Sequence, residues 1–153
     1  MRFFNLFFRS ILIIICKKNK MLYITRKEHF SASHRLFNSK FSIKKNEDLF
    51  GKCNNFHGHN YYLEVTLCGD TDENSGYVFD LKKLSRVITK EILDKVDHKF
   101  LNDLAVFKNT IPTTENMAKI FWKILFPKLK TKNSQLYSIR LYETEKNMVE
   151  YKD

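Results

Sequence analysis

The 153 residues suffice for one domain with a buried core, and glycine and proline are too scarce for a linker or a disordered tail. The formal net charge is +10, yet the 27 basic residues are interspersed with 17 acidic ones and form no arginine-rich stripe. This pattern is typical of a solvated surface. It argues against a nucleic-acid partner and leaves room for an anionic small molecule.

The first twenty residues differ from the rest of the chain. They hold five basic residues, no acidic residue and a short apolar run at residues 11–15. No cleavage site of small residues follows that run, and it is far shorter than the ~20 apolar residues that span a bilayer. We expect Met21 to be the natural start, residues 1–20 to be a poorly structured extension, and residues 21–153 to be the domain. A weak membrane-surface anchor is the alternative for the extension.

Alternating apolar and polar residues predict strands in the first half of the domain. Residues 22–34 and 60–70 alternate and are rich in β-branched and aromatic side chains. Between them, residues 37–51 are polar and irregular, which indicates a loop with one helical turn. Turn residues around Gly76 precede a short apolar run at residues 77–80, so we expect a returning strand and a hairpin there.

Apolar residues at helical spacing predict two helices in the second half. The first follows Asp80, a plausible N-cap, and ends near the stretch V-D-H-K-F. The second covers residues 112–129, and residues 135–144 and 148–152 are predicted to be two final strands. Helices grouped after strands indicate an α+β fold, with an antiparallel sheet and helices on one face.

Two histidines, His57 and His59, are separated by a single glycine where the chain enters a strand. Side chains at i and i+2 of a strand point to one face, so both imidazoles can reach the same ion. His34, near the end of the strand that could pair alongside, supplies a third ligand. Three histidines leave one position open on a tetrahedral zinc ion, as in catalytic sites. From spacing alone, unrelated surface histidines explain the pattern equally well.

The three cysteines, Cys16, Cys53 and Cys68, show no framework spacing, and their odd number leaves at least one thiol unpaired. This usage favours a reducing compartment, so we expect a cytoplasmic location. Cys53 lies close to the two histidines. Three roles are open for Cys53. It could be a fourth metal ligand, a base or nucleophile whose pKa is lowered by a nearby imidazole, or an ordinary buried thiol. The last role is the expectation for Cys16 and Cys68.

Other candidates have roles that spacing does not decide. Asp97 and His98 adjoin at the predicted helix end, where they can act as partners only if the helix has stopped. Otherwise they are a surface acid and a histidine favoured by the helix dipole. Glu143 lies on a mostly apolar strand, either at an exposed edge or held for a ligand. The T-T-E segment at residues 113–115 more often caps a helix than binds a ligand.

Six stretches of the chain match one protein family in the same order: F-S-A-S-H-R-L, F-G-K-C-N-N, H-G-H-N-Y, L-D-K-V-D-H-K-F-L-N, P-T-T-E-N and L-Y-E-T-E-K-N-M-V-E-Y. They span residues 22–152 and resemble the 6-pyruvoyl-tetrahydropterin and 6-carboxy-tetrahydropterin synthases. The resemblance implies the tunnelling fold, in which a four-stranded antiparallel sheet carries two helices on one face. It also implies a homohexamer, built as a dimer of trimers.

The resemblance implies a role for each candidate residue. The family's Zn²⁺ ligands match His34, His57 and His59. Its catalytic cysteine, a proton-transfer base, matches Cys53, and the partners of that cysteine, which arrive from a neighbouring subunit, match Asp97 and His98. The family's substrate-binding residues match Thr113, Thr114, Glu115 and Glu143, and in the family the last of these anchors the pterin ring through two hydrogen bonds.

The resemblance further implies a zinc-dependent lyase that acts on 7,8-dihydroneopterin triphosphate, and two products are open. In the 6-pyruvoyl branch the cysteine typically stands further ahead of the H-G-H motif, whereas here only Asn54, Asn55 and Phe56 intervene. The short spacing favours the 6-carboxy enzyme of queuosine biosynthesis, which releases acetaldehyde and triphosphate. The G-K-C-N-N and L-Y-E-T-E-K-N-M-V-E-Y stretches look more like the 6-pyruvoyl type, which keeps the three-carbon side chain.

Two hypotheses of other classes stand beside the enzyme. One is a non-catalytic, zinc-stabilised oligomeric binding protein that has kept the fold. The other is a basic module that binds nucleic acid or a membrane surface through the N-terminal lysines, and it predicts steeply salt-sensitive binding. The joint presence of Cys53, Asp97, His98 and Glu143 favours the enzyme, with no nucleic-acid or membrane partner.

Deleting residues 1–20 tests the expected domain boundary. Activity and solubility should be unchanged, because all six matching stretches begin after residue 21. Steady-state turnover and the soluble yield of the two chains provide the comparison. A collapse of either quantity in the shortened chain would show that the extension belongs to the functional protein.

Overall fold

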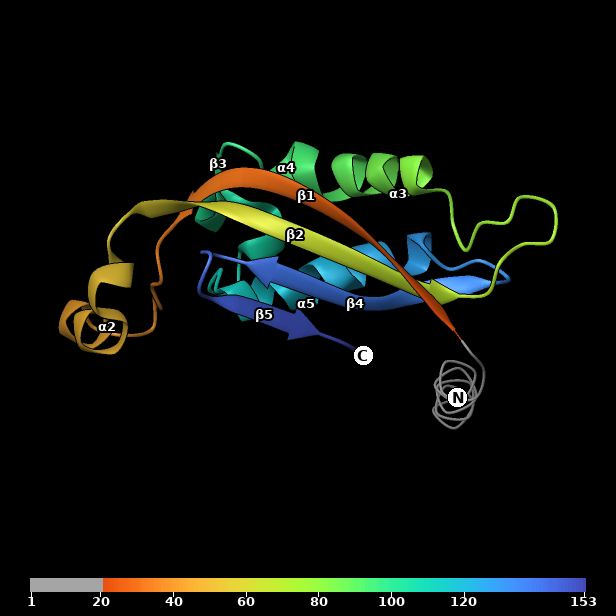
Figure 1. Cartoon of the computed structure of the whole chain (residues 1–153). Coiled ribbons are helices and arrows are strands. Elements are labelled where there is room, and N and C mark those ends of the chain that lie inside the picture. The colour runs from red at the N-terminus through yellow and green to blue at the C-terminus, as the bar shows by residue number, and fades with distance from the viewer. Residues whose placement is uncertain (1–20) are drawn as a thin grey trace.

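The computed structural model describes residues 21–153. Five strands form one sheet in the order β3-β1-β2-β4-β5 (Figure 1). Their bounds are β1 (Leu22–His34), β2 (His57–Gly69), β3 (Lys99–Phe100), β4 (Ser134–Tyr142) and β5 (Met148–Tyr151). The pairs β1–β2, β2–β4 and β4–β5 are antiparallel, and the short β3 runs parallel to β1. The predicted extension at residues 1–20 lies outside the described residues.

The predicted α+β class is confirmed, with two differences in the strands. The two-residue strand β3 adds a fifth strand at one edge of the four antiparallel strands. The returning strand predicted at residues 77–80 is wrong, because β2 pairs with β1 and β4 instead. Val78 and Phe79 are buried in an irregular segment. Their apolar character therefore reflects contact with the core and not a strand ladder.

The helices follow the capping chemistry of the sequence. Helix α3 (Leu81–Ile88) continues through a π-helical segment (Thr89–Leu93) into α4 (Asp94–Val96). Asp80 caps α3, since its carboxylate accepts hydrogen bonds from the backbone N–H groups of the first turn. Helix α5 (Thr114–Leu125) is capped by Thr113. The structure also contains short 3-10 turns at Gly51–Asn54, Leu101–Asp103, Ala105–Phe107 and Phe126–Lys128.

The segment between β1 and β2 is more helical than the single turn predicted. Helix α2 (Ile43–Phe50) begins after Ser42, whose hydroxyl accepts from the backbone N–H of Lys45 at 3.2 Å. Two apolar side chains of α2, Ile43 and Leu49, are exposed. The polar surroundings of these residues hid the amphipathic pattern, so the sequence indicated a loop.

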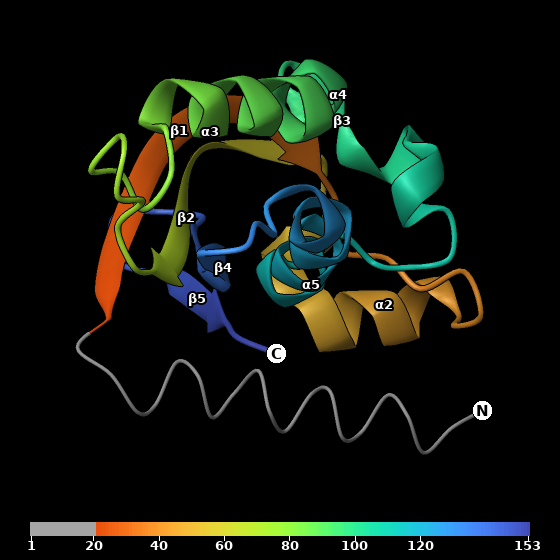
Figure 2. The ribbon, with the colours of Figure 1, turned by 90° about the vertical axis from the view of Figure 1, so that its right-hand side faces the viewer.

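The core fills the space between one face of the sheet and the helices. Figure 2 shows the sheet curving around α3 and α5, and α5 contacts β4 and β5 while α3 contacts β1. The strands supply alternate residues to this face, among them Tyr61, Leu63 and Val65, all fully buried. The opposite face carries polar pairs such as Lys27–Glu64, with 3.6 Å between nitrogen and oxygen.

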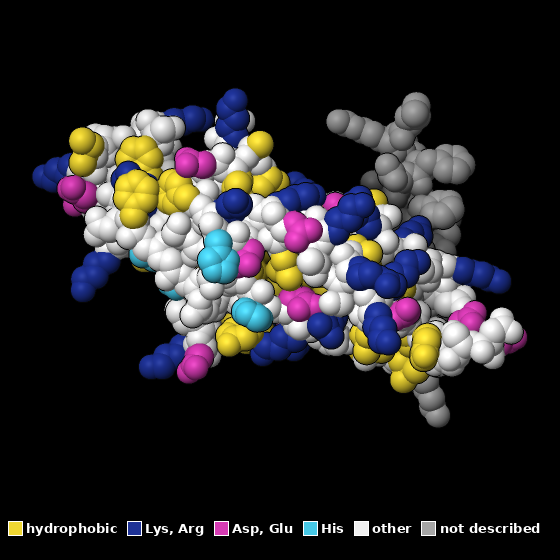
Figure 3. All heavy atoms as spheres, turned by 90° about the horizontal axis from the view of Figure 1, so that it is seen from above, with side chains coloured by type: hydrophobic (Ala, Val, Ile, Leu, Met, Phe, Trp, Pro, Cys, Tyr) yellow, Lys and Arg dark blue, Asp and Glu magenta, His cyan; other side chains and the backbone are white. Residues whose placement is uncertain are grey.

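Charge on the surface is mixed. On the face seen in Figure 3, Lys and Arg side chains lie among Asp and Glu side chains and form no single stripe. Within residues 21–153, no helix has the length and apolar character needed to cross a membrane.

A pair of leucine variants tests the position of the core. Leu63→Ala should lower the free energy of unfolding by about 2–5 kcal/mol, because this side chain is fully buried between the sheet and the helices. The matched control is Leu49→Ala in α2, where the leucine is 59% exposed and the change should be within about 0.5 kcal/mol. Urea unfolding followed by circular dichroism measures both. Equal destabilisation by the two variants would contradict this placement of the core.

Candidate metal centre and active site

The register of β1 and β2 brings three distant histidines together. His34 is the last residue of β1 and pairs directly with His57, the first residue of β2. His59, two residues on, lies on the same face as His57, and Ala32 is its partner across the strands. Nitrogen atoms of the three rings, one from each, lie within 4.8 Å of one another.

Hydrogen bonds at Nδ1 make Nε2 the available ligand atom of His34 and His57. Nδ1 of His34 lies 2.8 Å from the carbonyl oxygen of Pro112, and Nδ1 of His57 lies 2.8 Å from that of Asn55. A carbonyl only accepts, so Nδ1 donates in both rings and Nε2 keeps a free lone pair. Nε2 of His59 is buried and has no hydrogen-bond partner. A buried imidazole nitrogen without a hydrogen-bond partner is a candidate metal ligand.

Burial keeps two of these rings in the form that binds metal. Desolvation lowers the pKa of His34 below its usual value, and it lowers the pKa of His59 in the same way. Both imidazoles are therefore neutral near pH 7, as a ligand must be. Three imidazole ligands suit zinc, and such a site keeps a fourth position for a water molecule or a substrate oxygen.

A carboxylate adjoins the histidine cluster. Glu143 follows β4 directly, and its Oε1 atom lies 3.7 Å from Nε2 of both His34 and His59. The hydroxyl group of Thr114 donates a hydrogen bond to the same oxygen at 3.2 Å. Glu143 is thus oriented toward the metal side of the site.

Sequence reasoning missed Tyr61 as a neighbour of the site. Its side chain is fully buried, and its hydroxyl lies 3.5 Å from Nε2 of His34. Burial and the nearby charge of Glu143 both raise the pKa of the phenol. Tyr61 is four residues after His57 on an alternating strand, so the same period that linked His57 to His59 would have found it.

The three residues at the start of α5 divide their roles. Thr114 reaches Glu143, whereas the Thr113 hydroxyl accepts from the backbone N–H of Asn116 and caps the helix. Glu115 is exposed in the first turn, where its negative charge suits the helix dipole.

Cys53 stands apart from the histidine cluster. It lies on the 3-10 turn before β2, its side chain is exposed, and its thiol is free. Its carbonyl oxygen accepts a 2.8 Å hydrogen bond from the backbone N–H of Leu36, which fixes the turn beside the end of β1. The arrangement holds a thiol near the site without making it one of the three grouped ligands.

Asp97 and His98 form a pair at the edge of β1. The helix ends at Val96, so Asp97 and His98 lie beyond it and can contact each other. Asp97 Oδ1 lies 3.0 Å from His98 Nδ1 and accepts a 2.8 Å hydrogen bond from the backbone N–H of Ser31. That backbone bond is the largest cause of the lowered pKa of Asp97.

His98 adopts a left-handed backbone conformation that is uncommon outside glycine. Its φ is 55°, and its backbone N–H donates to the Ser31 carbonyl at 2.6 Å. The side chain is 81% exposed. Among the described residues, neither Asp97 nor His98 forms a hydrogen bond with the Cys53 thiol of the same chain.

The chain resembles characterised enzymes over nearly its full length. The profile of one family, described as PTPS, 6-pyruvoyl tetrahydropterin synthase, matches residues 23–153. The chain belongs to the 6-pyruvoyl tetrahydropterin synthase family. All the candidate residues above lie within the matched range.

Individual members of the 6-pyruvoyl tetrahydropterin synthase family are similar throughout. The 6-pyruvoyl tetrahydrobiopterin synthase of Dictyostelium discoideum is 41% identical over 135 residues, which is 88% of this chain and 98% of that protein. The protein of the same name from Homo sapiens is 41% identical over 132 residues, covering 84% and 90%. The solved structure of Caenorhabditis elegans 6-pyruvoyl tetrahydropterin synthase matches with a TM-score of 0.80 at 40% identity, covering 87% of this chain and 96% of that one.

Removing one imidazole tests the metal centre. His34→Ala should reduce bound zinc from about one ion per chain to a small fraction, because two imidazoles alone hold the ion weakly. Zinc is measured by elemental analysis after dialysis. The matched control, His29→Ala, removes an exposed histidine from the same strand and should leave the zinc content unchanged. Full zinc occupancy in His34→Ala would rule out the three-histidine site.

Proposed function

We propose that the chain is a zinc-dependent lyase that converts 7,8-dihydroneopterin triphosphate to the 6-pyruvoyl product with loss of triphosphate. The observation that carries the proposal is the cluster of three histidines whose ring nitrogens lie within 4.8 Å of one another, in a chain of the 6-pyruvoyl tetrahydropterin synthase family. Membership of that family supports the coarser statement, a lyase that acts on a pterin.

The choice of product changes once the relatives are known. The short spacing between Cys53 and His57 favoured the 6-carboxy enzyme of queuosine biosynthesis. Relatives that are 41% identical over most of the chain are named 6-pyruvoyl tetrahydrobiopterin synthases, and this similarity extends far beyond one loop. We therefore prefer the 6-pyruvoyl product, and the spacing keeps the 6-carboxy product as the alternative.

The proposed chemistry divides between the metal and the protein. His34, His57 and His59 would hold the zinc ion, which would supply a Lewis acid for the side-chain hydroxyls of the substrate. Cys53 is free and exposed, and in its thiolate form it would accept the proton from the side-chain carbon next to the ring and become a neutral thiol.

Glu143, Thr113, Thr114 and Glu115 are proposed to bind the substrate, with Glu143 on the pterin ring as the family resemblance implies. The hydrogen bond from the Thr114 hydroxyl to Glu143 at 3.2 Å supports a joint role for these two residues. The Glu143 carboxylate also lies 3.7 Å from two histidine nitrogens, which supports a substrate position beside the histidine cluster.

Asp97 and His98 are proposed to act at the site of a neighbouring subunit in a homohexamer. The Asp97 carboxylate accepts from Nδ1 of His98, so Nε2 is the nitrogen that can move a proton. The 81% exposure of the His98 side chain supports a partner outside this chain. A cytoplasmic location stays a prediction from the cysteine usage.

Product analysis tests the proposed reaction. Zinc-loaded protein is incubated with dihydroneopterin triphosphate, and the products are identified by mass spectrometry. We expect triphosphate and a tetrahydropterin that retains all three side-chain carbons, with no acetaldehyde. Release of acetaldehyde would establish the 6-carboxy branch, and no turnover of the pterin would refute the proposed function. Cys53→Ala serves as the control, with turnover lower by about 10²–10⁴-fold and zinc retained. Loss of zinc from this variant would make Cys53 a ligand.

A further inference from the structure

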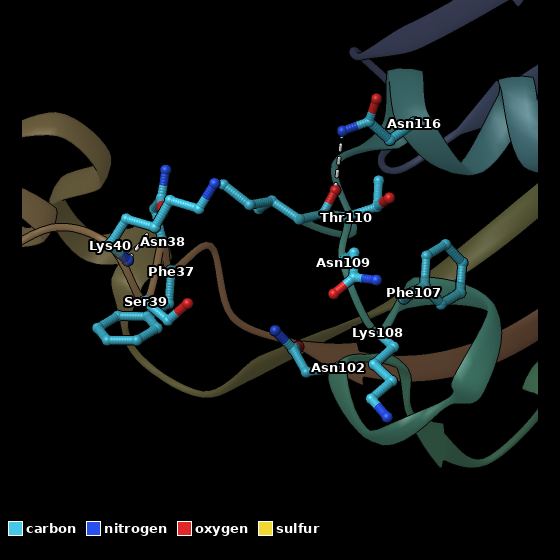
Figure 4. Close-up of a pocket in the computed structure, with 11 residues that line it drawn as sticks. Phe37, Asn38, Ser39, Lys40, Asn102, Phe107, Lys108, Asn109, Thr110 and Asn116 are labelled. Atoms are coloured by element: carbon cyan, nitrogen blue, oxygen red, sulfur yellow. Dashed lines mark hydrogen bonds between the residues drawn. The ribbon is translucent and has the colours of Figure 1, made fainter.

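A hollow of about 630 Å³ lies between the segment that follows β1 and the segment that leads into α5. Figure 4 shows its two walls facing each other, with Phe37, Ser39 and Lys40 on one side and Asn102 and Asn109 on the other. Its volume is within the range of small-molecule pockets, about 300–1,000 Å³. No residue of the proposed chemistry lines it, so its ligand is a separate question.

The lining of this pocket is positively charged and rich in donors. It contains Lys40 and Lys108 and no acidic residue. Neither ammonium group forms an ion pair with a described carboxylate. Ser39, Asn109 and Thr110 add side-chain donors that have no hydrogen-bond partner within residues 21–153. This set of groups suits an anion with several oxygen atoms.

Buried amides hold the first wall in place. Asn46 is fully buried, and its Nδ2 donates to the carbonyl oxygens of Asn38, Phe41 and Ser42 at 3.0–3.3 Å. Its Oδ1 accepts from the backbone N–H of Asn38 at 2.7 Å. These hydrogen bonds hold the backbone of the loop that carries Lys40. The loop therefore loses little conformational entropy when a ligand binds.

The second wall is fixed in a similar way. The Asn102 amide makes two 2.9 Å hydrogen bonds with the backbone N–H and carbonyl of Arg35. The Asn116 amide donates to the carbonyl of Ile111 at 2.9 Å, the contact drawn in Figure 4. The next residue, Pro112, is the one whose carbonyl receives Nδ1 of His34. Residues 111 and 112 thus connect the lining of the pocket to the histidine cluster.

An arginine connects the pocket to the Cys53 turn. Arg35 follows His34, and its guanidinium carbon lies 4.4 Å from the ring centroid of Phe37, a lining residue. Its Nη2 donates to Oδ1 of Asn54, next to Cys53, at 2.9 Å. Nε of Arg35 is buried with no partner, and the guanidinium pairs with no described carboxylate. Positive charge therefore continues from the catalytic turn to the pocket.

We propose that this pocket binds a polyphosphate, and that within the proposed reaction it holds the triphosphate chain of the substrate. Lys40 and Lys108 bind the phosphate oxygens, and Arg35 contacts the end of the chain nearest the metal. The position fits the order of groups in the substrate, since the triphosphate is attached to the same three-carbon side chain that the metal would hold. This inference deepens the proposed function and depends on it only for the identity of the ligand.

Binding of inorganic triphosphate to the zinc-loaded protein tests the site without any turnover. Isothermal titration calorimetry should show tighter binding of triphosphate than of orthophosphate. The double variant Lys40→Ala/Lys108→Ala should weaken triphosphate binding by roughly tenfold or more, because charge-assisted hydrogen bonds are lost. The matched control, Lys44→Ala/Lys119→Ala, removes the same charge from exposed helix positions outside the pocket and should change the affinity less than about twofold. Zinc content is measured before and after each titration, to exclude removal of the metal by triphosphate.

The outcomes separate this proposal from the proposed function. Equal affinities in the two double variants, or no binding of triphosphate to the wild-type chain at millimolar concentration, would overturn the site. If the substrate's own chain occupies the pocket, Lys40→Ala/Lys108→Ala also raises KM for dihydroneopterin triphosphate and leaves the affinity for a pterin without phosphate unchanged. An unchanged KM with weakened triphosphate binding would assign the pocket to the free anion. If the wild-type chain converts no pterin, the proposed function fails, and the binding result still decides the pocket.

Discussion

The pairing of β1 with β2 is the constraint on which the site depends. The two strands are in register over thirteen residues, from Leu22 with Gly69 to His34 with His57. A slip of one residue would turn His57 and His59 to the opposite face and would expose Leu63 and Val65 to water. The same apolar contacts that hold the core together therefore fix the positions of the metal ligands. Gly58 allows the two strands to approach closely between the histidines, because a Cβ atom at this position would lie only 3.1 Å from the carbonyl oxygen of Ala32.

Around this register, backbone groups do much of the work of orienting side chains. The carbonyl oxygens of Pro112 and Asn55 orient the imidazoles of His34 and His57, respectively. The backbone of Ser31 forms hydrogen bonds with both Asp97 and His98. These acceptors and donors come from irregular segments or strand edges. Their positions follow from the fold and not from the identity of the residue that supplies them. This explains why the chemistry-bearing side chains stood out in the sequence while the groups that aim them did not.

The sequence predicted the fold class, β1, most of β2, both long helices and the three-histidine group, because each rests on periodicity or on a short spacing. It did not predict β3 or α2, and it predicted a strand at residues 77–80 that does not exist. At residues 77–80 tertiary contact overrides the local pattern, since Val78 and Phe79 are apolar because the core covers them. The pocket lined by Lys40, Lys108 and several amide side chains also had no signal in the sequence. Lys40 and Lys108 are far apart in the chain, and only the folded loops bring them to one hollow.

One consequence concerns the position of β1 between two kinds of site. The strand contributes His34 to the candidate metal site of its own chain, and its edge at Ser31 holds the Asp97–His98 pair, whose histidine is exposed. In the proposed hexamer each β1 then positions residues of two active sites, and no single subunit contains a complete active site. Subunits that lack His34 and subunits that lack His98 would complement each other when mixed. Catalysis would become a property of the contact between chains, so that dissociation of the assembly would switch off turnover without unfolding any subunit.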